Sequence, residues 1–206
     1  MFKKMLRAKP GAPAQSAPVI VVSGLPRSGT SMMMKMLSEG GLEVVTDAIR
    51  AADEDNPNGY FEFEPVKKLA EGQDSWLKDA GGKLVKVISA LLEHLPASHE
   101  YKVIFMEREI KEILASQQKM LQRRSEQSKA TDEELEAQFR DHLRATKYWL
   151  ARQPNMAVLY VDYNQLMADP ETHCQPVADF LGVPLDVARM RGVPNERLYR
   201  NRAARQ

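Results

Sequence analysis

The chain has 206 residues, enough for one α/β domain with a substantial core and too few for two full domains. Its 29 Lys and Arg residues nearly balance 28 Asp and Glu residues, and the formal charge of +1 excludes a global field that drives nonspecific binding to nucleic acid or anionic membranes. The single cysteine, Cys174, excludes an intrachain disulfide and offers no zinc-site spacing, which fits a reducing, cytoplasmic setting. The longest apolar run is as long as a strand and falls short of the ~20 residues of a spanning helix, so no membrane span is expected.

The first 17 residues combine basic side chains with Pro, Ala, Gln and Ser, and they lack the apolar stretch of a secretory signal. This composition predicts a flexible tail over residues 1–17, with a weak organellar signal as the alternative. We therefore expect the folded domain to occupy residues 18–206.

Residues 19–37 combine a buried strand, a glycine-punctuated turn and a helix start. After a parallel strand the chain must turn sharply, and Gly24 and Gly29 permit backbone angles and close approaches that a side chain would block. The amides from Arg27 to Ser31 can then converge on a phosphate at the positive end of the following helix. A plain strand-to-helix turn is the alternative, but it needs fewer glycines, hydroxyls and cations than this segment supplies.

This loop differs from the nucleotide-triphosphatase loop G-x-x-x-x-G-K-[ST] at one position. Both glycines and Ser31 fit, but Thr30 stands where the lysine should be. The lysine that usually binds the β- and γ-phosphates is therefore missing. The remaining groups suit a ligand with one phosphate beside another anionic group, held by amides, by the Arg27 cation and by the hydroxyls of Ser28, Thr30 and Ser31, with Gly29 between them.

Short apolar runs alternate with longer helical patterns along the rest of the chain. This alternation predicts a three-layer α/β/α fold with a central parallel sheet of about five strands, like that of P-loop NTPases. The expected strands are 18–23, 43–46, 84–88, 102–107 and 157–162. The expected helices are 30–40, 64–72, 89–95, 109–124, 132–152, 163–168 and 171–181. The capping-box spacing from Thr131 to Glu134 marks one helix start, and the methionines of 32–36 are expected in the core.

A second phosphate site is predicted where the strand 102–107 runs into the next helix. Arg108 stands at the carboxyl end of that strand, where open parallel sheets place ligands. Ser116 follows about two helical turns later, so its hydroxyl can lie on the same helix face. The alternative is that Arg108 simply pairs with Glu112.

These motifs together resemble the sulfotransferases that use 3′-phosphoadenosine 5′-phosphosulfate (PAPS). That family holds the 5′-phosphosulfate with a loop P-[KR]-S-G-T-[TS], matched by residues 26–31, and the 3′-phosphate with an Arg and a later Ser, matched by Arg108 and Ser116. The segment 159–166, followed by Asp169-Pro170 and Phe180-Leu181-Gly182, is similar to the family's Tyr-x-x-Leu, Asp-Pro and Phe-Leu-Gly segment. The resemblance spans residues 18–188.

The resemblance implies a lysine near the transferring group, and Lys86 fits that place. Cytosolic members of the family end the same strand Lys-x-His and use the histidine as base, but Ile88 occupies its position here. Relatives with a Pro-Arg-Ser-Gly-Thr loop use a glutamate, so we expect Glu62 to be the base, with Glu64 as second choice. The alternative for Glu62 is a carboxylate at a helix start.

The sequence offers three further groups of candidates. Asp53 and Asp55 can serve as bases or as turn hydrogen-bonding groups. The family's Gly-rich C-terminal segment is not recognisable, and its substitutes are either Arg189, Arg191 and Gly192 or Arg197, Arg200 and Arg202, with a basic surface tail as the alternative. The histidines, His94, His99, His142 and His173, show no metal or triad spacing, and no metal is expected.

The sequence thus predicts a PAPS-dependent sulfotransferase that moves a sulfuryl group in line to a hydroxyl or amine of a small-molecule, carbohydrate or peptide acceptor. Arg27 and Lys86 would offset developing charge, and Glu62 would accept the proton. One alternative is a P-loop nucleotide kinase or NTPase, which needs a lysine at position 30 and for which Asp162 could hold Mg²⁺. The other is a noncatalytic nucleotide-binding protein with the same fold.

Overall fold

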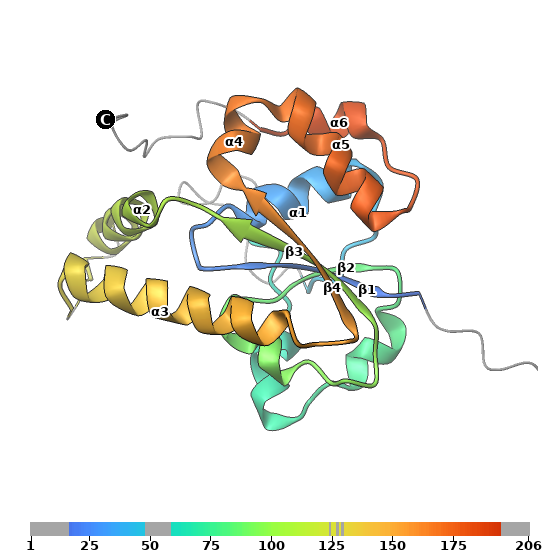
Figure 1. Ribbon diagram of the computed structural model, residues 1–206, viewed down its shortest axis with the longest axis horizontal. Coiled ribbons are helices and arrows are strands. Elements are labelled where there is room, and N and C mark those ends of the chain that lie inside the picture. Colours follow the sequence, from blue (N-terminus) through green and yellow to red (C-terminus); the bar gives the residue numbers. More distant parts are fainter. Residues whose placement is uncertain (1–16, 48–58, 124, 127, 129, 195–206) are drawn as a thin grey trace, which may run out of the picture.

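A parallel sheet of four strands forms the centre of the computed structural model, which describes residues 17–47, 59–123, 125–126, 128 and 130–194 (Figure 1). The strands are β1 (Val19–Gly24), β2 (Leu84–Lys86), β3 (Tyr101–Glu107) and β4 (Met156–Asp162). Their spatial order is β2-β1-β3-β4, and every neighbouring pair is parallel. Because parallel strands end at one edge, the segments that follow β1, β2 and β3 meet there.

The predicted strand 43–46 is wrong, and the described sheet therefore has four strands where about five were expected. Only Val44 makes an isolated parallel bridge, to Leu84. The ladder does not continue because the next backbone N–H, that of Asp47, donates to the carbonyl oxygen of Glu62 at 3.4 Å, and the hydroxyl of Thr46 donates to the same oxygen at 2.9 Å. This segment thus leaves the sheet to hold the chain around Glu62.

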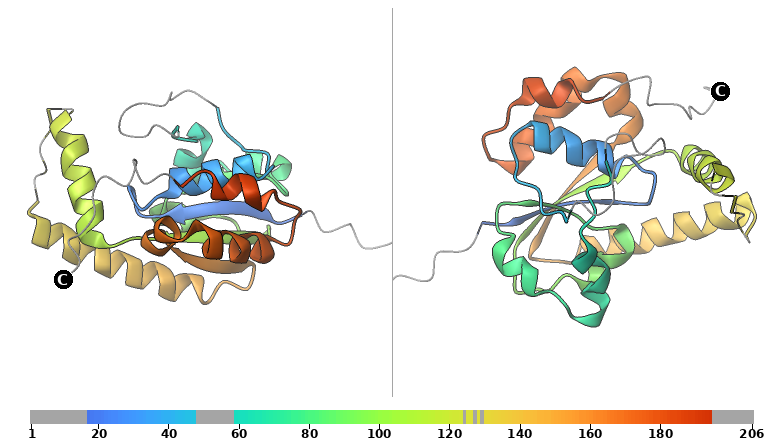
Figure 2. Two further views of the ribbon diagram at one scale, coloured as in Figure 1. Left: turned by 90° about the horizontal axis from the view of Figure 1, so that it is seen from above. Right: turned by 180° about the vertical axis from the view of Figure 1, so that it is seen from behind.

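Helices cover both faces of the sheet, which confirms the three-layer α/β/α prediction (Figures 1 and 2). One face carries α1 (Thr30–Glu39), α4 (Tyr163–Ala168), α5 (Pro170–Leu181) and α6 (Val187–Arg191). The other carries α3 (Asp132–Leu150) and the 3₁₀ helices η1 (Glu64–Glu71), η2 (Ser75–Asp79) and η3 (Ser89–His94), while α2 (Ile110–Arg123) packs on α3. The sequence did not predict η2 or α6, and the segments expected as helices at 64–72 and 89–95 are 3₁₀ helices.

Each face of the sheet has its own core, because strand residues alternate between the faces. On β1, Ile20 and Val22 pack with α1, α4 and α5, whereas Val19 and Val21 pack with η1 and η3. The methionines predicted for the core belong to α1 and are all buried: Met32, Met33, Met34 and Met36. Both layers therefore hold the carboxyl edge of the sheet in place.

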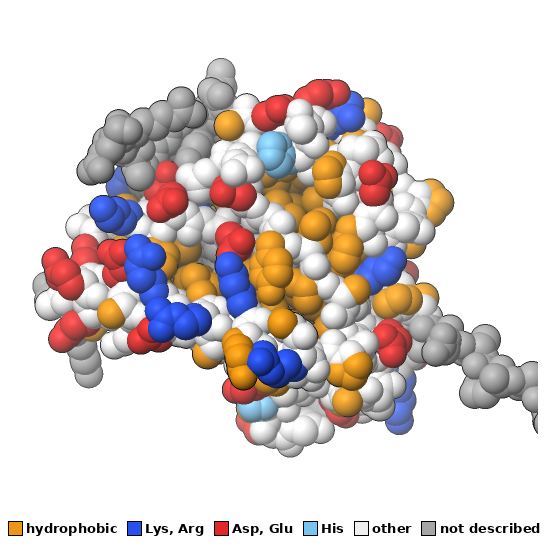
Figure 3. Space-filling model, viewed as in Figure 1, with side chains coloured by type: hydrophobic (Ala, Val, Ile, Leu, Met, Phe, Trp, Pro, Cys, Tyr) orange, Lys and Arg blue, Asp and Glu red, His pale blue; other side chains and the backbone are white. Residues whose placement is uncertain are grey.

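The capping box at the start of α3 is confirmed, since Thr131 N donates to Glu134 Oε2 at 2.9 Å and Glu134 N donates to Thr131 Oγ1 at 3.3 Å. β4 is an edge strand, and its residue Tyr160 is 40% exposed. Hydrophobic side chains lie at the surface on the face of the molecule that Figure 3 shows. Within the described residues, none of the helices combines the length and the hydropathy that crossing a bilayer requires.

Candidate active site

The turn after β1 is shaped by two glycines, as the sequence predicted. Gly24 and Gly29 have φ of 146° and 99°, backbone angles that residues with a side chain rarely adopt. A Cβ at Gly24 would lie 2.5 Å from Ser28 Oγ and 2.7 Å from the carbonyl oxygen of Met106. The loop therefore folds back tightly on itself and on the end of β3.

Ser28 and the start of α1 both present polar groups without a side-chain partner among the described residues. Ser28 is 1% exposed, and its Oγ has no hydrogen-bond partner among the described residues. Within this part of the structure, α1 also begins without a side-chain cap, and its first turn, Thr30-Ser31-Met32, contains no acidic residue. First-turn amides and an unpartnered buried hydroxyl are groups that an anionic ligand satisfies.

The two predicted phosphate sites join in one network. Arg27 Nε donates to Ser116 Oγ at 3.0 Å, and Arg108 Nη1 donates to the carbonyl oxygen of Arg27 at 3.1 Å. Arg108 also pairs with Glu112, Nε to Oε2 at 3.0 Å, with both side chains buried. The alternative considered for Arg108 is therefore present as well, and the pair with Glu112 fixes its guanidinium beside the loop. Among the described residues, these contacts join two arginines and one carboxylate at the carboxyl ends of β1 and β3.

Tyr163 belongs to this site, although the sequence analysis assigned it only to a structural segment. A Cβ at Gly29 would lie 2.3 Å from the Tyr163 ring, so the bare glycine backbone packs directly against that ring. The guanidinium carbon of Arg108 lies 4.3 Å from the ring centroid. Burial raises the pKa of Tyr163, and Arg108 opposes that shift. Its position directly after β4, at the carboxyl edge of the sheet, is the sequence signal that could have identified it.

A cavity of about 280 Å³ opens next to the loop at the carboxyl end of β3. Leu25 and Ser28 line it from the loop, Arg108 and Ile113 from the β3–α2 segment, and Leu143 from α3. Arg108 therefore borders open space that a ligand can enter, and the Ser28 hydroxyl lies buried directly behind this lining.

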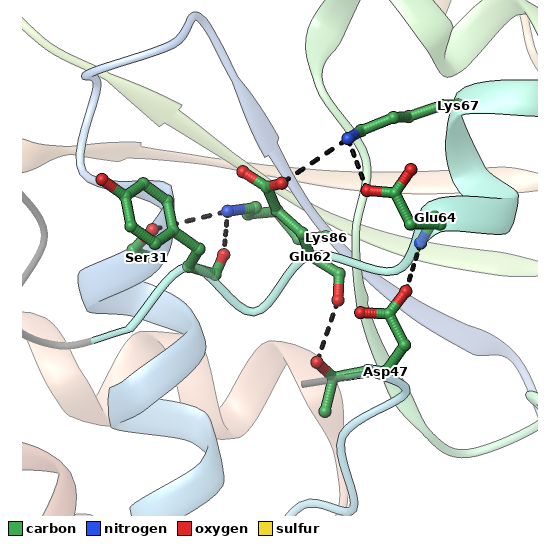
Figure 4. Close-up of polar contacts among 8 residues, drawn as sticks. Ser31, Asp47, Glu62, Glu64, Lys67 and Lys86 are labelled. Atoms are coloured by element: carbon green, nitrogen blue, oxygen red, sulfur yellow. Dashed lines mark hydrogen bonds and ion pairs between the residues drawn. The ribbon is translucent and has the colours of Figure 1, made fainter. Parts of the chain in front are cut away.

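Lys86 connects the loop to the segment that carries the candidate bases (Figure 4). Its Nζ donates to the carbonyl oxygen of Tyr60 and lies 3.5 Å from Ser31 Oγ. The predicted charge-offsetting lysine thus lies between α1 and residues 60–64. Ile88 follows two residues later and is 42% exposed.

The structure distinguishes the two glutamates (Figure 4). Glu64 is the helix-start carboxylate: it begins η1, its backbone N donates to Asp47 Oδ2 at 2.6 Å, and its Oε1 lies 2.5 Å from Lys67 Nζ. Glu62 precedes the helix, its side chain is 25% exposed, and its Oε2 lies 3.7 Å from the same Nζ. The helix-start alternative therefore applies to Glu64 rather than to Glu62.

Lys67 carries its charge between these carboxylates. The hydrogen bond with Glu64 raises the pKa of Lys67, and the charges of both glutamates act in the same direction. At neutral pH this side chain is a cation beside both candidate bases.

The remaining candidates lie either outside the described residues or in contacts on another side of the fold. Asp53 and Asp55, and likewise Arg197, Arg200 and Arg202, lie outside the described residues. Arg191 pairs with Glu171 at 2.5 Å, and Arg189 lies 3.8 Å from Asp186, so both are engaged on the α5–α6 side of the fold. Within the described residues, no group of three or more His, Cys, Asp or Glu side chains is placed to hold a metal ion.

The geometry is that of an α/β protein with a glycine-shaped loop and an uncapped helix start at the carboxyl edge of a parallel sheet. The family model described as "Sulfotransferase domain" matches residues 17–202, and the chain belongs to this sulfotransferase family. No curated protein sequence matches the chain significantly.

Solved sulfotransferase structures share the fold. A sulfotransferase from Mycobacterium tuberculosis is 17% identical with a TM-score of 0.57, covering 86% of this chain and 71% of its own. The sulfotransferase domain of a Synechococcus olefin synthase is 16% identical with a TM-score of 0.50, covering 95% of this chain and 88% of its own. A mouse sulfotransferase, solved in complex with PAP, is 13% identical with a TM-score of 0.50, covering 93% of this chain and 68% of its own.

Proposed function

We propose that this protein is a PAPS-dependent sulfotransferase that moves a sulfuryl group in line to a hydroxyl or amine acceptor and releases 3′,5′-adenosine bisphosphate (PAP). Two observations together support the proposal. Ser28 is buried with an unpartnered hydroxyl, and the neighbouring Arg27 forms a hydrogen-bond network with Ser116 and Arg108. The neighbour solved with PAP supports the choice of donor.

The residues present fit an anionic donor. The uncapped start of α1 and the hydroxyls of Ser28, Thr30 and Ser31 suit a phosphosulfate, whose charge the positive helix end favours. Arg108 and Ser116 suit the 3′-phosphate, since Arg108 is held rigidly by Glu112 and both side chains belong to one network. PAPS supplies an activated sulfuryl group on a phosphate that leaves readily.

On the transfer side, Lys86 and Arg27 would stabilise negative charge that develops on oxygen as the group moves. Lys86 is suited to this because Tyr60 and Ser31 already fix its Nζ between the loop and the base-bearing segment. Glu62 would take the proton of the acceptor, a role in which a side chain contributes typically ~10² to 10⁴-fold. Glu64 is committed to Lys67 and to the start of η1, which favours Glu62.

A phosphate-transferring enzyme fits less well. Its loop needs a lysine at position 30 to hold β- and γ-phosphates, and that residue is Thr30. We therefore expect PAP to bind more tightly than ATP with Mg²⁺.

Calorimetric titration of the wild type with PAP, and in parallel with ATP and Mg²⁺, tests the proposal. Ser28→Ala removes a hydroxyl that has no described protein partner, so folding should be unaffected while PAP binding weakens by about 1.5 to 3 kcal/mol, the value of a hydrogen bond to a charged group. Ser23→Ala is the matched control, because Ser23 Oγ is also buried without a described partner but lies within β1.

Preference for ATP and Mg²⁺, or equal PAP affinity in the Ser28→Ala and wild-type proteins, would contradict the proposed donor site. PAP binding without transfer from PAPS to any acceptor would instead support the noncatalytic alternative.

A further inference from the structure

The backbone next to the candidate base is strained. Phe61, between Tyr60 and Glu62, has φ of 48°, in the left-handed region that a bulky residue rarely enters. Such a conformation costs on the order of 1–3 kcal/mol and persists only where its surroundings hold it. Phe61 lies directly before Glu62. The contacts that hold the Phe61 backbone therefore also fix the direction of the Glu62 side chain.

Hydrogen bonds hold the carbonyl groups on both sides of Phe61. Lys86 Nζ donates to the carbonyl oxygen of Tyr60. The hydroxyl of Thr46 donates to the carbonyl oxygen of Glu62 at 2.9 Å, and the backbone N of Asp47 approaches the same oxygen at 3.4 Å. Figure 4 shows that these contacts come from separate segments that converge on residues 60–64.

The carboxylate of Glu62 has its own support. Lys67 Nζ lies 3.7 Å from Glu62 Oε2 and 2.5 Å from Glu64 Oε1. Glu64 is anchored at the start of η1, so it fixes the position of the lysine. The longer distance to Glu62 means that Lys67 attracts this carboxylate without closing a short ion pair on it.

We propose that Thr46 and Lys67 are positioning residues for Glu62. Thr46 fixes the backbone that carries the base, and the charge of Lys67 restrains the Glu62 carboxylate so that it stays in one position. Glu64 anchors Lys67 and does not itself take the proton. This inference rests on the proposed function, because it assigns Glu62 the role of base in sulfuryl transfer.

The test compares paired variants in the full chain. Lys67→Met removes the cation and Lys67→Arg keeps it; Thr46→Val removes the hydroxyl and Thr46→Ser keeps it. Lys35→Met is the matched control, since Lys35 forms a comparable exposed pair with Glu39 at 2.7 Å on α1. The rate of PAP release from PAPS is measured with 2-naphthol, tyramine and N-acetylglucosamine as acceptor probes, and PAP binding by calorimetry.

We expect kcat to fall about tenfold in Lys67→Met and Thr46→Val, with PAP affinity unchanged and with recovery in Lys67→Arg and Thr46→Ser, since misplacing a reacting group lowers turnover. Wild-type kcat in Lys67→Met and Thr46→Val, as in Lys35→Met, overturns the proposal. Crystal structures of the same two variants give a readout that needs no acceptor: an unmoved Glu62 carboxylate overturns it, and a displaced one supports it.

The proposed function and this inference can be contradicted by different results. If wild-type protein does not bind PAP, the donor assignment is wrong, whereas PAP binding with no effect of the positioning variants contradicts only the inference about Thr46 and Lys67.

Discussion

Arg27 donates from its Nε to the Oγ of Ser116 at 3.0 Å, across 89 residues of sequence. The contact fastens the loop after β1 to α2, and the bond from Arg108 to the Arg27 carbonyl oxygen reinforces it. The two motifs predicted to bind anions are separate in the sequence but are joined in the structure by these hydrogen bonds. A ligand with two anionic groups would bind both parts at once.

Removing the Ser116 hydroxyl tests this coupling. In Ser116→Ala, Arg27 loses its side-chain anchor, and we expect PAP affinity to fall about tenfold, the value of one hydrogen bond of about 1.4 kcal/mol. Calorimetry measures the affinity, and thermal unfolding checks that the buried site remains folded. Ser98→Ala, on the exposed turn before His99, is the control and should bind PAP like the wild type. Equal affinities for the two variants would show that Ser116 does not support the donor site.

Gly29→Ala should damage both the fold and the site. The added Cβ would lie 2.3 Å from the Tyr163 ring at a φ of 99°, so the loop or the tyrosine must move. We expect a loss of about 2–4 kcal/mol in the free energy of unfolding, combining steric overlap with backbone strain, and loss of PAP binding. Urea denaturation measures the stability.

Gly72→Ala separates strain from overlap. Gly72 has φ of 75°, but a Cβ there would meet no atom within 4 Å in the described part of the chain. This variant should lose only about 1 kcal/mol and should keep PAP binding. If the two variants are equally stable, the packing of Tyr163 on Gly29 is not tight.

Patterns local in sequence predicted most of the fold. The strands around Val21 and Ile104 are unbroken apolar runs, as expected for strands buried on both faces, and their ends were placed closely. The strand predicted at 43–46 was wrong because the apolar content of this segment does not reveal that Thr46 bonds to the chain at Glu62. Whether a short apolar run continues a ladder depends on distant partners, which no local pattern contains.

Prediction of the site residues from the sequence was limited in the same way. Loop residues such as Ser28 could be predicted, because glycine, hydroxyl and cation positions are contiguous. The position of Tyr163 directly after a strand was a usable signal, but its contact with Gly29 depends on packing. Lys67 could not be assigned from spacing, since its importance comes from lying between two carboxylates. The choice between Glu62 and Glu64 likewise required knowing that η1 begins at Glu64.

Exchanging each glutamate for its amide should separate their roles. Glu62→Gln should lower kcat by about 10² to 10⁴-fold and leave PAP affinity unchanged, because the amide cannot accept the proton. Glu64→Gln should reduce turnover much less, because it weakens only the anchor of Lys67. Steady-state kinetics with PAPS and an accepted probe, together with calorimetry, measure both effects. A larger loss in Glu64→Gln would move the base assignment to that residue.

Cys174 should be inert in the folded protein and should make stability depend on alkaline pH. Its side chain is fully buried in the core beneath α5, and burial raises the pKa of the thiol from 9.0 to about 11. The native thiol therefore stays protonated at pH 8. We expect negligible labelling by iodoacetamide at that pH and rapid labelling in urea.

The sign of the pH effect follows from which form folding favours. The folded state holds the thiol proton more tightly than the unfolded state, so this contribution to stability is complete below pH 9 and is lost as pH rises from 9 toward 11. Cys174→Ala removes the titrating group, so its free energy of unfolding should fall less steeply over that range than that of the wild type. Urea unfolding of both proteins at several alkaline pH values measures the difference. Parallel curves would mean that the thiol titrates alike in both states and that the core around Cys174 opens to solvent.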